Sequence, residues 1–327
     1  MKLPRRKFLQ FAGAAAIAPV FSRLAMAQAY PSRPITMIVP FPAGGAADAT
    51  ARVLAEQMRG LLRQPIVIEN LSGADGSIGT GRVARARPDG YTIQLGITST
   101  HMMNGALYSL SYDVVNDFAP ISPLSAVPYV LFAGKTMPAK DLNELIAWLK
   151  ANPNKASAGI AASSLRLITA FFQKETGTRF TLVPYRGVAP ALQDLVGGQI
   201  DLLFTTLDPL PLVRAGSIKA YVATTDTRLA LAPDIPTFGE TELPLSFSGL
   251  GWNGLFAPKG TPKEIIDRLN AAVVQALADP AVQSRVANLG GEIFSRERQT
   301  PEALGALQKA QIEKWWPLIK EFGITAE

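Results

Sequence analysis

Residues 34–48 read PITMIVPFPAGGAAD, a β-rich run that passes through small residues into a helical pattern. The run from Pro34 to Pro40 has the apolar and β-branched content of a short strand. After Gly45, apolar side chains recur at steps of four and three, which marks one buried face of a helix. The members of that face are Ala47, Ala51, Leu54, Met58 and Leu61. The stretch therefore predicts a strand, a tight loop of small residues and a helix.

Strand and helix signals alternate along the rest of the chain. Further strands are predicted at residues 66–69, 91–96, 129–133, 200–204 and 219–224. This alternation is typical of an α/β protein with mainly parallel sheets. The 327 residues exceed what one hydrophobic core usually organises, so we expect two lobes. A second unit of strand, small-residue loop and helix at residues 156–173 would give each lobe a loop facing a shared crevice.

The first 27 residues have the pattern of an export signal. A basic start is followed by an apolar run over residues 8–20 and by Ala25-Met26-Ala27, a small-x-small pattern that signal peptidases cut. The run is too short for a membrane span, which needs about 20 apolar residues. Residues 5–10 resemble a twin-arginine signal, although Pro4 and Gln10 depart from its usual pattern. We expect export to the periplasm with removal of the leader; a cytoplasmic protein with an amphipathic start is the alternative.

Removal of the leader changes the charge of the chain. The whole sequence has 32 basic and 26 acidic side chains, a net charge of +6. The leader contains five of the basic residues and no acidic one, which leaves 27 against 26. These five are Lys2, Arg5, Arg6, Lys7 and Arg23. A nearly neutral mature chain without a basic stripe argues against nucleic acid or an anionic membrane as a partner.

The composition also argues against catalysis and metal binding. The sequence has no cysteine, which excludes thiolate nucleophiles, cysteine-ligated metals and disulfides. The sequence has a single histidine, His101, which is too few for a metal site made of histidines and leaves little basis for a histidine-based catalytic triad. We therefore expect no enzyme, no metal and no cofactor.

Two loops of small residues are candidate anion sites. A strand that turns through glycine and alanine into a helix presents free backbone N–H groups and the positive end of the helix dipole. Residues 44–47 form such a loop, with Asp48 placed to cap free N–H groups, although glycine after a strand is often only a turn. The loop at residues 159–164 repeats the pattern and adds the hydroxyls of Ser163 and Ser164.

Three other features favour structural roles. The glycine-rich stretch 73–81 lacks the Gly-Lys-Ser/Thr end of a P-loop and the order of a dinucleotide fingerprint, so we interpret it as a turn. His101 follows the third strand at an edge where ligands bind, but no nucleophile or orienting partner is near it in sequence. A hydrogen-bonding or structural role is therefore favoured for it over a general base. Trp315 and Trp316 are predicted to pack rather than to surround a ligand.

Several motifs together resemble the tripartite tricarboxylate transporter receptors, also called Bug proteins. They include IVPFPAGGAAD at 38–48, VIEN at 67–70, PDGYT at 88–92, VPYRG at 183–187, GGQID at 197–201 and APKGTP at 257–262. The matches occur in the family's order and span essentially the whole mature chain. The resemblance implies a two-lobe, Venus-flytrap periplasmic-binding-protein fold. We expect lobe 1 at residues 28–127 and 254–327 and lobe 2 at 128–253, each with a mostly parallel sheet flanked by helices.

The resemblance also implies which residues bind the ligand, a small organic acid that is delivered to a membrane permease. The first-lobe loop would hold one carboxylate through main-chain N–H groups and ordered water, and the second-lobe loop would hold the other end. Residues around 99–101 and 184–187 would line the crevice. The expected binding residues are Phe41, Gly44, Gly45, Ala46, Ala47, Asp48, Ser99, Thr100, His101, Ala161, Ala162, Ser163, Ser164, Tyr185, Arg186 and Thr205.

Two departures from the family pattern bear on the ligand. Members commonly have Gly-Asn-Gly-Thr-Thr-Ser-His in the second loop, whereas this chain has apolar residues in the middle and Leu165 at the end. Many members also carry an aspartate that can meet an amino group where this chain has Thr205. An amino-acid ligand would lose that buried counter-charge, so a dicarboxylate or an aromatic acid is favoured. We expect a monomer that passes this acid to a permease; an exported enzyme and a ligand sensor for a signalling partner are the alternatives.

Overall fold

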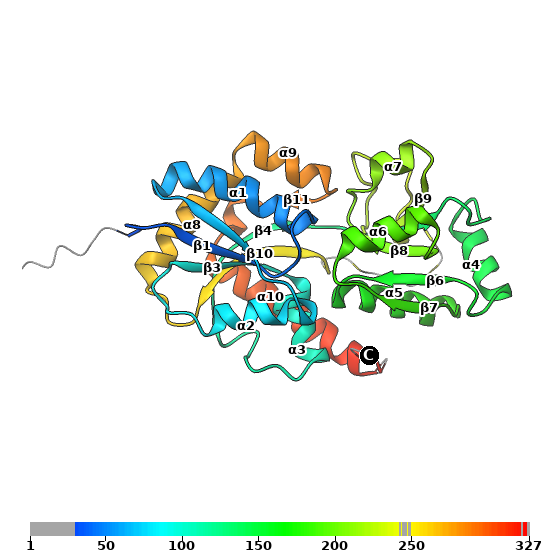
Figure 1. Ribbon diagram of the computed structural model, residues 1–327, viewed down its shortest axis with the longest axis horizontal. Helices are drawn as coiled ribbons and strands as arrows, with labels where there is room; N and C mark the ends of the chain where they lie inside the picture. Colours follow the sequence, from blue (N-terminus) through cyan, green and yellow to red (C-terminus); the bar gives the residue numbers. More distant parts are fainter. Residues whose placement is uncertain (1–29, 242, 244–246, 248–249, 322, 326–327) are drawn as a thin grey trace, which may run out of the picture.

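The computed structural model describes residues 30–241, 243, 247, 250–321 and 323–325, which form two lobes side by side (Figure 1). The predicted leader, residues 1–27, lies outside the described residues. Within the described part, no helix combines the length and the hydropathy that a membrane span needs. Each lobe contains one β-sheet flanked by helices, which confirms the predicted α/β class.

The first lobe is built on a six-stranded sheet with the order β11-β4-β10-β3-β1-β2. Its strands are β1 (Ile35–Val39), β2 (Ile66–Asn70), β3 (Thr92–Ile97), β4 (Phe118–Ala126), β10 (Trp252–Pro258) and β11 (Glu292–Ile293). β1 pairs in parallel with β2 and β3, so that Met37 lies opposite both Ile68 and Ile93. β10 runs antiparallel to β3 and β4, and β11 runs antiparallel to β4.

The second lobe is built on a five-stranded sheet with the order β7-β6-β8-β5-β9. Its strands are β5 (Val130–Gly134), β6 (Ser157–Ile160), β7 (Thr181–Pro184), β8 (Leu202–Thr205) and β9 (Ile218–Ala223). β6 pairs in parallel with β7 and β8, whereas β5 runs antiparallel to β8 and β9.

Parallel pairing holds for β2-β1-β3 and for β7-β6-β8, but the expectation of mostly parallel sheets is wrong for the remaining pairs. The physical reason lies in where the chain crosses between lobes. Three residues separate the end of β4 from the start of β5, and β10 is the first strand after the chain returns to the first lobe. A strand that enters its sheet at the crevice runs away from it, and so it lies antiparallel to neighbours that run toward it.

Helices cover both faces of each sheet (Figure 1). The first lobe contains α1 (Ala46–Leu62), α2 (Ser77–Ala84), α3 (Asn104–Leu107), α8 (Lys263–Leu277), α9 (Pro280–Asn288) and α10 (Pro301–Glu321). The second lobe contains α4 (Leu142–Ala151), α5 (Ser163–Thr176), α6 (Val188–Gly197) and α7 (Leu210–Arg214). Single helical turns are η2 (Ala74–Gly76), η3 (Ser99–Met103), η4 (Phe238–Glu240) and η5 (Arg296–Arg298). Stretch 73–81, interpreted from the sequence as a turn, is a turn only up to Gly76 and then begins α2.

The predicted apolar face of α1 is buried against its sheet. Leu54 and Met58 are at most 1% exposed, and they belong to the same hydrophobic cluster as Ile35, Met37 and Val39 of β1. The strand residues are themselves fully buried. Packing of this face against β1 fixes where α1 begins and therefore where the loop before it lies.

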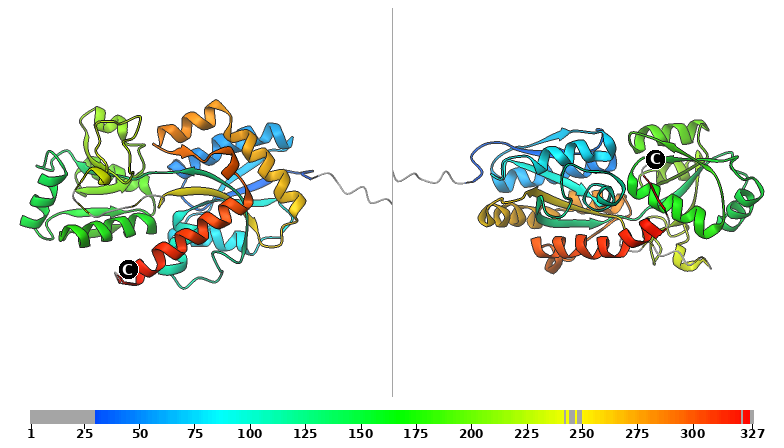
Figure 2. Two further views of the ribbon diagram at one scale, coloured as in Figure 1. Left: turned by 180° about the vertical axis from the view of Figure 1, so that it is seen from behind. Right: turned by 90° about the horizontal axis from the view of Figure 1, so that it is seen from below.

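The last helix joins the two lobes. α10 packs on β4 of the first sheet and extends toward the second lobe (Figure 2). Trp315 is 1% exposed, and the centroid of its ring lies 6.4 Å from those of Phe171 on α5 and Phe247. Trp316 donates its Nε1 hydrogen to the backbone oxygen of Met102 at 3.1 Å. Both tryptophans pack, as predicted, and Trp315 does so between lobes.

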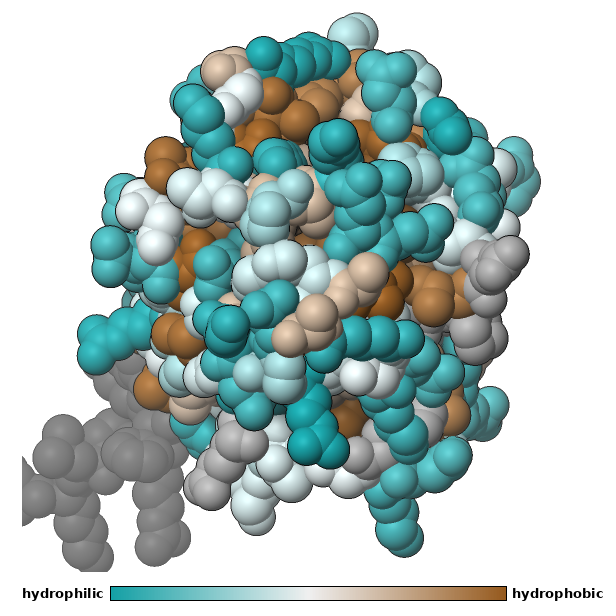
Figure 3. All heavy atoms as spheres, turned by 90° about the vertical axis from the view of Figure 1, so that its right-hand side faces the viewer, coloured by the Kyte–Doolittle hydropathy of each residue, from teal (hydrophilic) through white to brown (hydrophobic). Residues whose placement is uncertain are grey.

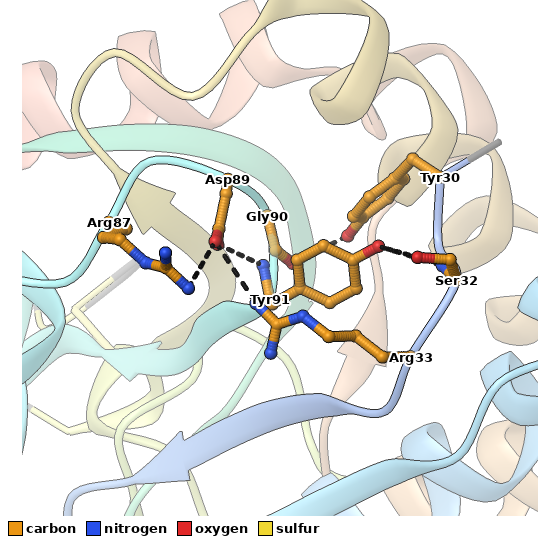
Figure 4. Close-up of polar contacts among 7 residues, drawn as sticks. All are labelled: Tyr30, Ser32, Arg33, Arg87, Asp89, Gly90 and Tyr91. Atoms are coloured by element: carbon orange, nitrogen blue, oxygen red, sulfur yellow. Dashed lines mark hydrogen bonds and ion pairs between the residues drawn. The ribbon is translucent and has the colours of Figure 1, made fainter. Parts of the chain in front are cut away.

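A polar cluster holds the start of the described chain on the first lobe (Figure 4). The hydroxyl of Tyr30 donates to the backbone oxygen of Gly90 at 2.7 Å. Arg33 lies 3.2 Å from Asp89, and its guanidinium carbon is 3.8 Å from the centre of the Tyr91 ring. Gly90 has a φ of +77°, which glycine adopts without strain. The PDGYT motif at 88–92 therefore holds Tyr30 to Arg33, the first described residues, on the lobe.

The outer end of the second lobe is mostly hydrophilic, with hydrophobic residues in small groups between polar ones (Figure 3). Large apolar side chains that are exposed in the described part are spread over both lobes. They are Val67, Ile78, Val115, Val196 and Leu231. Scattered apolar residues of this kind are ordinary for a protein surface and do not form a docking patch.

We predict that Leu54→Ala lowers the free energy of unfolding by about 2–5 kcal/mol, because it empties a buried position between α1 and the sheet. Chemical denaturation followed by circular dichroism measures the loss. Val67→Ala is the control, since Val67 is 52% exposed and its truncation should change the same quantity by less than about 0.5 kcal/mol. Equal losses in the two variants would contradict the packing of α1 described above.

Candidate functional site

One carboxylate holds the loop between β1 and α1 in shape. Asp48 Oδ2 accepts the backbone N–H of Gly44 and the Nε hydrogen of Arg52, both at 2.9 Å, and Oδ1 accepts from Asn70 at 3.0 Å. Burial alone would raise the pKa of Asp48, but these hydrogen bonds and the Arg52 charge outweigh it and hold the pKa below its usual value. Asp48 therefore stays ionised, and it occupies the Gly44 N–H that we expected to meet a ligand.

The start of α1 leaves other backbone N–H groups free of helical acceptors. Gly45 precedes the helix with an extended backbone and no side-chain cap. The first helical hydrogen bond runs from Ala49 to Gly45, so the N–H groups of Ala46 and Ala47 have no acceptor within the helix. Gly45, Ala46 and Ala47 all line a cavity between the lobes. The loop thus presents backbone donors and the positive end of a helix dipole to that space.

The start of α5 is capped from the other lobe. Its N-cap residue, Ala162, has no side-chain acceptor. Instead the N–H of Ser163 donates to Asp75 Oδ2 at 2.8 Å, and the N–H of Ser164 donates to Ser99 Oγ at 3.2 Å. Both acceptors belong to the first lobe. Two of the free donors of α5 are therefore satisfied by the protein itself.

A small cavity of about 120 Å³ lies where three helices begin. It is lined by residues 45–47 at the start of α1, residues 161, 162, 164 and 165 at the start of α5, and residues 187–190 at the start of α6. Among the described residues that line it, none has a charged side chain, and most of its surface is apolar. Three helix dipoles thus direct their positive ends at one space, which favours an anion held through backbone groups.

Thr205 contributes an unsatisfied hydroxyl to this cavity. The residue is 1% exposed, and its Oγ1 has no hydrogen-bond partner among the described residues. A buried hydroxyl without a partner costs free energy unless a ligand or water satisfies it. Tyr129 also lines the cavity, but its hydroxyl already lies 3.3 Å from Ser164 Oγ. Thr205 is therefore in position to bind a polar atom of a ligand.

A larger cavity of about 550 Å³ adjoins the small one. Three residues line both: Phe41, Ala161 and Ala162. The larger cavity carries charges, with Asp75 from the first lobe and Arg166 and Arg186 from the second. Tyr185 also lines it and donates its hydroxyl to Asp194 at 2.6 Å. Protein sites for small molecules usually have volumes of about 300–1,000 Å³, and the two cavities together fall in that range.

Asp75 is carried by an unusual turn. Gly73 to Gly76 all have positive φ, with Ala74 at 45° and Asp75 at 51°. Residues with a Cβ atom adopt this region at a cost of about 1–2 kcal/mol each. Asn104 supports the turn, because its Nδ2 donates to the backbone oxygen of Asp75 at 2.8 Å and its Oδ1 accepts from Ser163 Oγ at 2.8 Å. The turn brings the Asp75 carboxylate to the start of α5.

Ser99, Thr100 and His101 lie behind the cavity wall, in the single turn η3. All three are fully buried, and none is among the residues that line the two cavities, so their role in binding stays a prediction. The His101 ring stacks on Phe256 with centroids 3.9 Å apart, its Nδ1 lies 3.0 Å from Thr100 Oγ1, and burial lowers its pKa to about 3. The imidazole is therefore neutral and enclosed. No group of three or more metal-ligating side chains occurs in the described part of the chain.

The structure brings most of the expected residues to the two cavities. They are Phe41, Gly45, Ala46, Ala47, Ala161, Ala162, Ser163, Ser164, Tyr185, Arg186 and Thr205. Gly44, Asp48, Ser99, Thr100 and His101 are not among the lining residues. Sequence reasoning missed Asp75, Arg166 and the start of α6. An acidic residue inside a glycine-rich run was the available signal for Asp75.

Comparison with known proteins shows what this chain is similar to. A family model described as the tripartite tricarboxylate transporter family receptor matches residues 50–324. Bordetella pertussis BugT is 35% identical over 305 residues, which cover 91% of this chain and 91% of BugT.

Two similar solved structures come from Rhodopseudomonas palustris. MatC with bound malate is 36% identical with a TM-score of 0.84, over 89% of this chain and 100% of the MatC chain. Rpa4515 with adipate is 32% identical with a TM-score of 0.85, over 90% of this chain and 99% of the Rpa4515 chain.

We predict that stability depends on pH through Asp75. Burial raises the pKa of Asp75 to about 6 from an ordinary 3.8, against the lowering effects of the Ser163 hydrogen bonds and the Arg166 charge. Between these values the folded protein holds a proton that the unfolded chain has lost, so this contribution to stability falls as the pH rises from about 4 to about 6. The Tm of the wild-type protein relative to Asp75→Asn should fall over that range and then level off. A difference in Tm that stays constant with pH would contradict the enclosure of this carboxyl.

Proposed function

The chain belongs to the tripartite tricarboxylate transporter receptor family, and we propose that it captures a small organic carboxylate between its two lobes. The proposed ligand has an uncharged body, as in a dicarboxylate or an aromatic acid, and is not an amino acid. A permease of the tripartite tricarboxylate type is the proposed recipient. The family and the similar structures are those of binding proteins and not of enzymes, so no reaction is assigned to the site.

The observation that carries this proposal is the small cavity at the starts of α1, α5 and α6. Backbone donors and helix dipoles supply attraction for a carboxylate without any charged side chain in the wall. The apolar remainder of the wall suits an uncharged carbon body. The unsatisfied hydroxyl of Thr205 supplies one further polar contact.

The same cavity disfavours an amino acid. An ammonium group bound there would be removed from water, and no acidic side chain among the described lining residues would pair with it. The malate and adipate bound by two similar proteins support a small acid without an amino group as the ligand class.

The proposed place of action is the periplasm. The export pattern of residues 1–27, with its twin-arginine features, supports this placement together with the family. The proposed lobes are residues 28–127 with 254–327 and residues 128–253, and the proposed working form is a monomer. No cofactor of this chain is part of the proposal.

A thermal-shift screen tests the proposed function. Monocarboxylates, dicarboxylates and aromatic acids should raise the Tm with concentration, and at a hundred times Kd a ligand stabilises the folded state by about 2.7 kcal/mol. Amino acids and nucleotides serve as the comparison sets and should leave the Tm unchanged. A shift with those sets alone, or chemical turnover of an acid, would show that the proposal is wrong.

Gly45→Val should weaken ligand binding strongly without disturbing the fold. A Cβ atom at Gly45 meets only the backbone oxygen of Pro42, at 3.7 Å, and the extended backbone there suits any residue. The branched side chain would cover the donors at the start of α1, so we expect affinity to drop at least about tenfold, which is about 1.4 kcal/mol. Calorimetry with the best acid of the screen measures this. Gly60→Val, on the exposed end of the same helix, is the control and should bind normally.

Thr205→Asp should weaken the binding of a purely anionic ligand by at least about tenfold, because it adds a negative charge to the cavity. Thr205→Val keeps the shape and removes only the hydroxyl. It should leave the Tm of the free protein unchanged or higher, since the hydroxyl has no partner among the described residues. Tighter binding of the acid by Thr205→Asp would indicate that the ligand carries a cation at this point.

A further inference from the structure

We propose that Asp75 makes this receptor selective for acids with a single carboxylate, because its own carboxylate fills the anion position at the start of α5. The inference rests on the proposed function and selects among the ligands named there: it keeps an acid with one carboxylate, aromatic or aliphatic, and rejects the dicarboxylate. A two-lobe site could otherwise hold one carboxylate at each helix start. In this chain the second of those positions is already taken.

The contacts of Asp75 show how the position is filled. Its Oδ2 accepts the N–H of Ser163, the first residue of α5, at 2.8 Å. A free helix start binds a carboxylate through this kind of donor. The next donor, the N–H of Ser164, is occupied by Ser99, which is itself fully buried. The protein thus supplies acceptors for the first two donors of α5.

A strained turn and a buried asparagine hold Asp75 in its position. Gly73 to Gly76 hold four successive positive φ angles, two of them at residues with a Cβ atom. Asn104 is fully buried and bonds both sides of the contact, the Asp75 backbone and the Ser163 hydroxyl. A strained turn that is fastened in this way costs stability, and such turns persist where the position of a side chain matters.

The starts of α1, α5 and α6 therefore differ in how many backbone N–H donors they leave open to the small cavity. At α1 the nearby carboxylate of Asp48 is turned to Gly44, Arg52 and Asn70, which leaves the donors of Ala46 and Ala47 open to the cavity. At α6 the third residue is Pro190, which has no N–H, so only Val188 and Ala189 offer donors there. One carboxylate on α1 and an apolar body toward Thr205 fit the cavity, whereas a second carboxylate at α5 would meet the charge of Asp75.

Arg166 and Arg186 suggest the alternative to this proposal, in which a second ligand carboxylate binds in the larger cavity. Both line the larger cavity, and a long diacid could place its far carboxylate there. Arg166, however, shares that cavity with Asp75 and already interacts electrostatically with its carboxylate. Much of the attraction that Arg166 could offer a second anion is thereby offset.

Paired acids of equal chain length test the proposal. We would titrate hexanoate against adipate and butanoate against succinate by calorimetry near pH 8, where all ligand carboxyls are ionised. The wild-type protein should bind each monocarboxylate at least about tenfold more tightly than its dicarboxylate partner. In Asp75→Gly this ratio should fall at least about tenfold, because glycine suits a φ of 51° and leaves the Ser163 N–H open. Asp226→Gly, at an exposed acidic residue outside both cavities, should keep the wild-type ratio.

Each outcome decides the matter. An unchanged ratio in Asp75→Gly, or a wild-type preference for the dicarboxylates, would overturn the role of Asp75. In the second case a loss of adipate but not hexanoate binding in Arg166→Gln would assign the far carboxylate to the larger cavity. Should Asp75→Gly fail to fold, Asp75→Asn keeps an acceptor without the charge and should lower the ratio by a smaller factor. If the wild-type protein bound no acid at all while it remained folded, the proposed function itself would be wrong.

Discussion

The unpaired backbone N–H groups at the starts of helices are the constraint on which this site depends. A helix leaves its first donors without partners, and burial makes that deficit expensive unless an acceptor arrives from elsewhere. Here α1, α5 and α6 begin at one small cavity whose described lining contains no charged side chain. The helices differ in how this deficit is met: Asp75 and Ser99 accept from the first donors of α5, whereas the described residues provide no acceptor for the N–H groups of Ala46 and Ala47 at α1. The pattern of satisfied and open donors defines what the cavity can bind.

The lobes meet through these same groups. Ser163 and Ser164 belong to the second lobe, and their acceptors belong to the first. Asn104 adds a contact to Ser163 Oγ, so the start of α5 carries several of the polar contacts between the lobes. A second point of contact is the ion pair between Arg285 of α9 and Asp208, at 3.1 Å. A ligand on α1 would rest beside this junction without replacing it. The contact between the lobes and the proposed ligand site therefore lie next to each other. The N–H groups of Ser163 and Ser164 make the contact, whereas those of Ala46 and Ala47 are proposed to bind the acid.

Local sequence was enough to predict the strand, loop and helix at residues 34–62, because apolar periodicity and small residues act over a few positions. The small-residue loops and the family resemblance together predicted Gly45 to Ala47, Ala161 and Thr205 as binding residues, and all five line the small cavity. The surroundings of Asp75 and His101 could not be predicted, since both depend on partners distant in the chain: Asp75 meets Ser163, and His101 stacks on Phe256. The positive φ angles at Ala74 and Asp75 also follow from tertiary contacts and not from residue type. The antiparallel strand pairs in both sheets were not predicted, because the points where the chain passes from one lobe to the other have no local pattern in the sequence.

The contact between Trp315 of α10 and Phe171 of α5 is a point about which α5 could rotate relative to the first lobe. Phe171, which meets Trp315, lies eight residues after Ser163 on the same helix, so the two points are about 12 Å apart along its axis. If α5 pivots as a rigid lever about that aromatic contact, a rotation of about ten degrees moves the Ser163 N–H by about 2 Å, more than a hydrogen bond tolerates. The end of α5 that would move most is its start, where Ser163 contacts Asp75. A rotation of this size would therefore be enough to break or form the contact between Ser163 and Asp75.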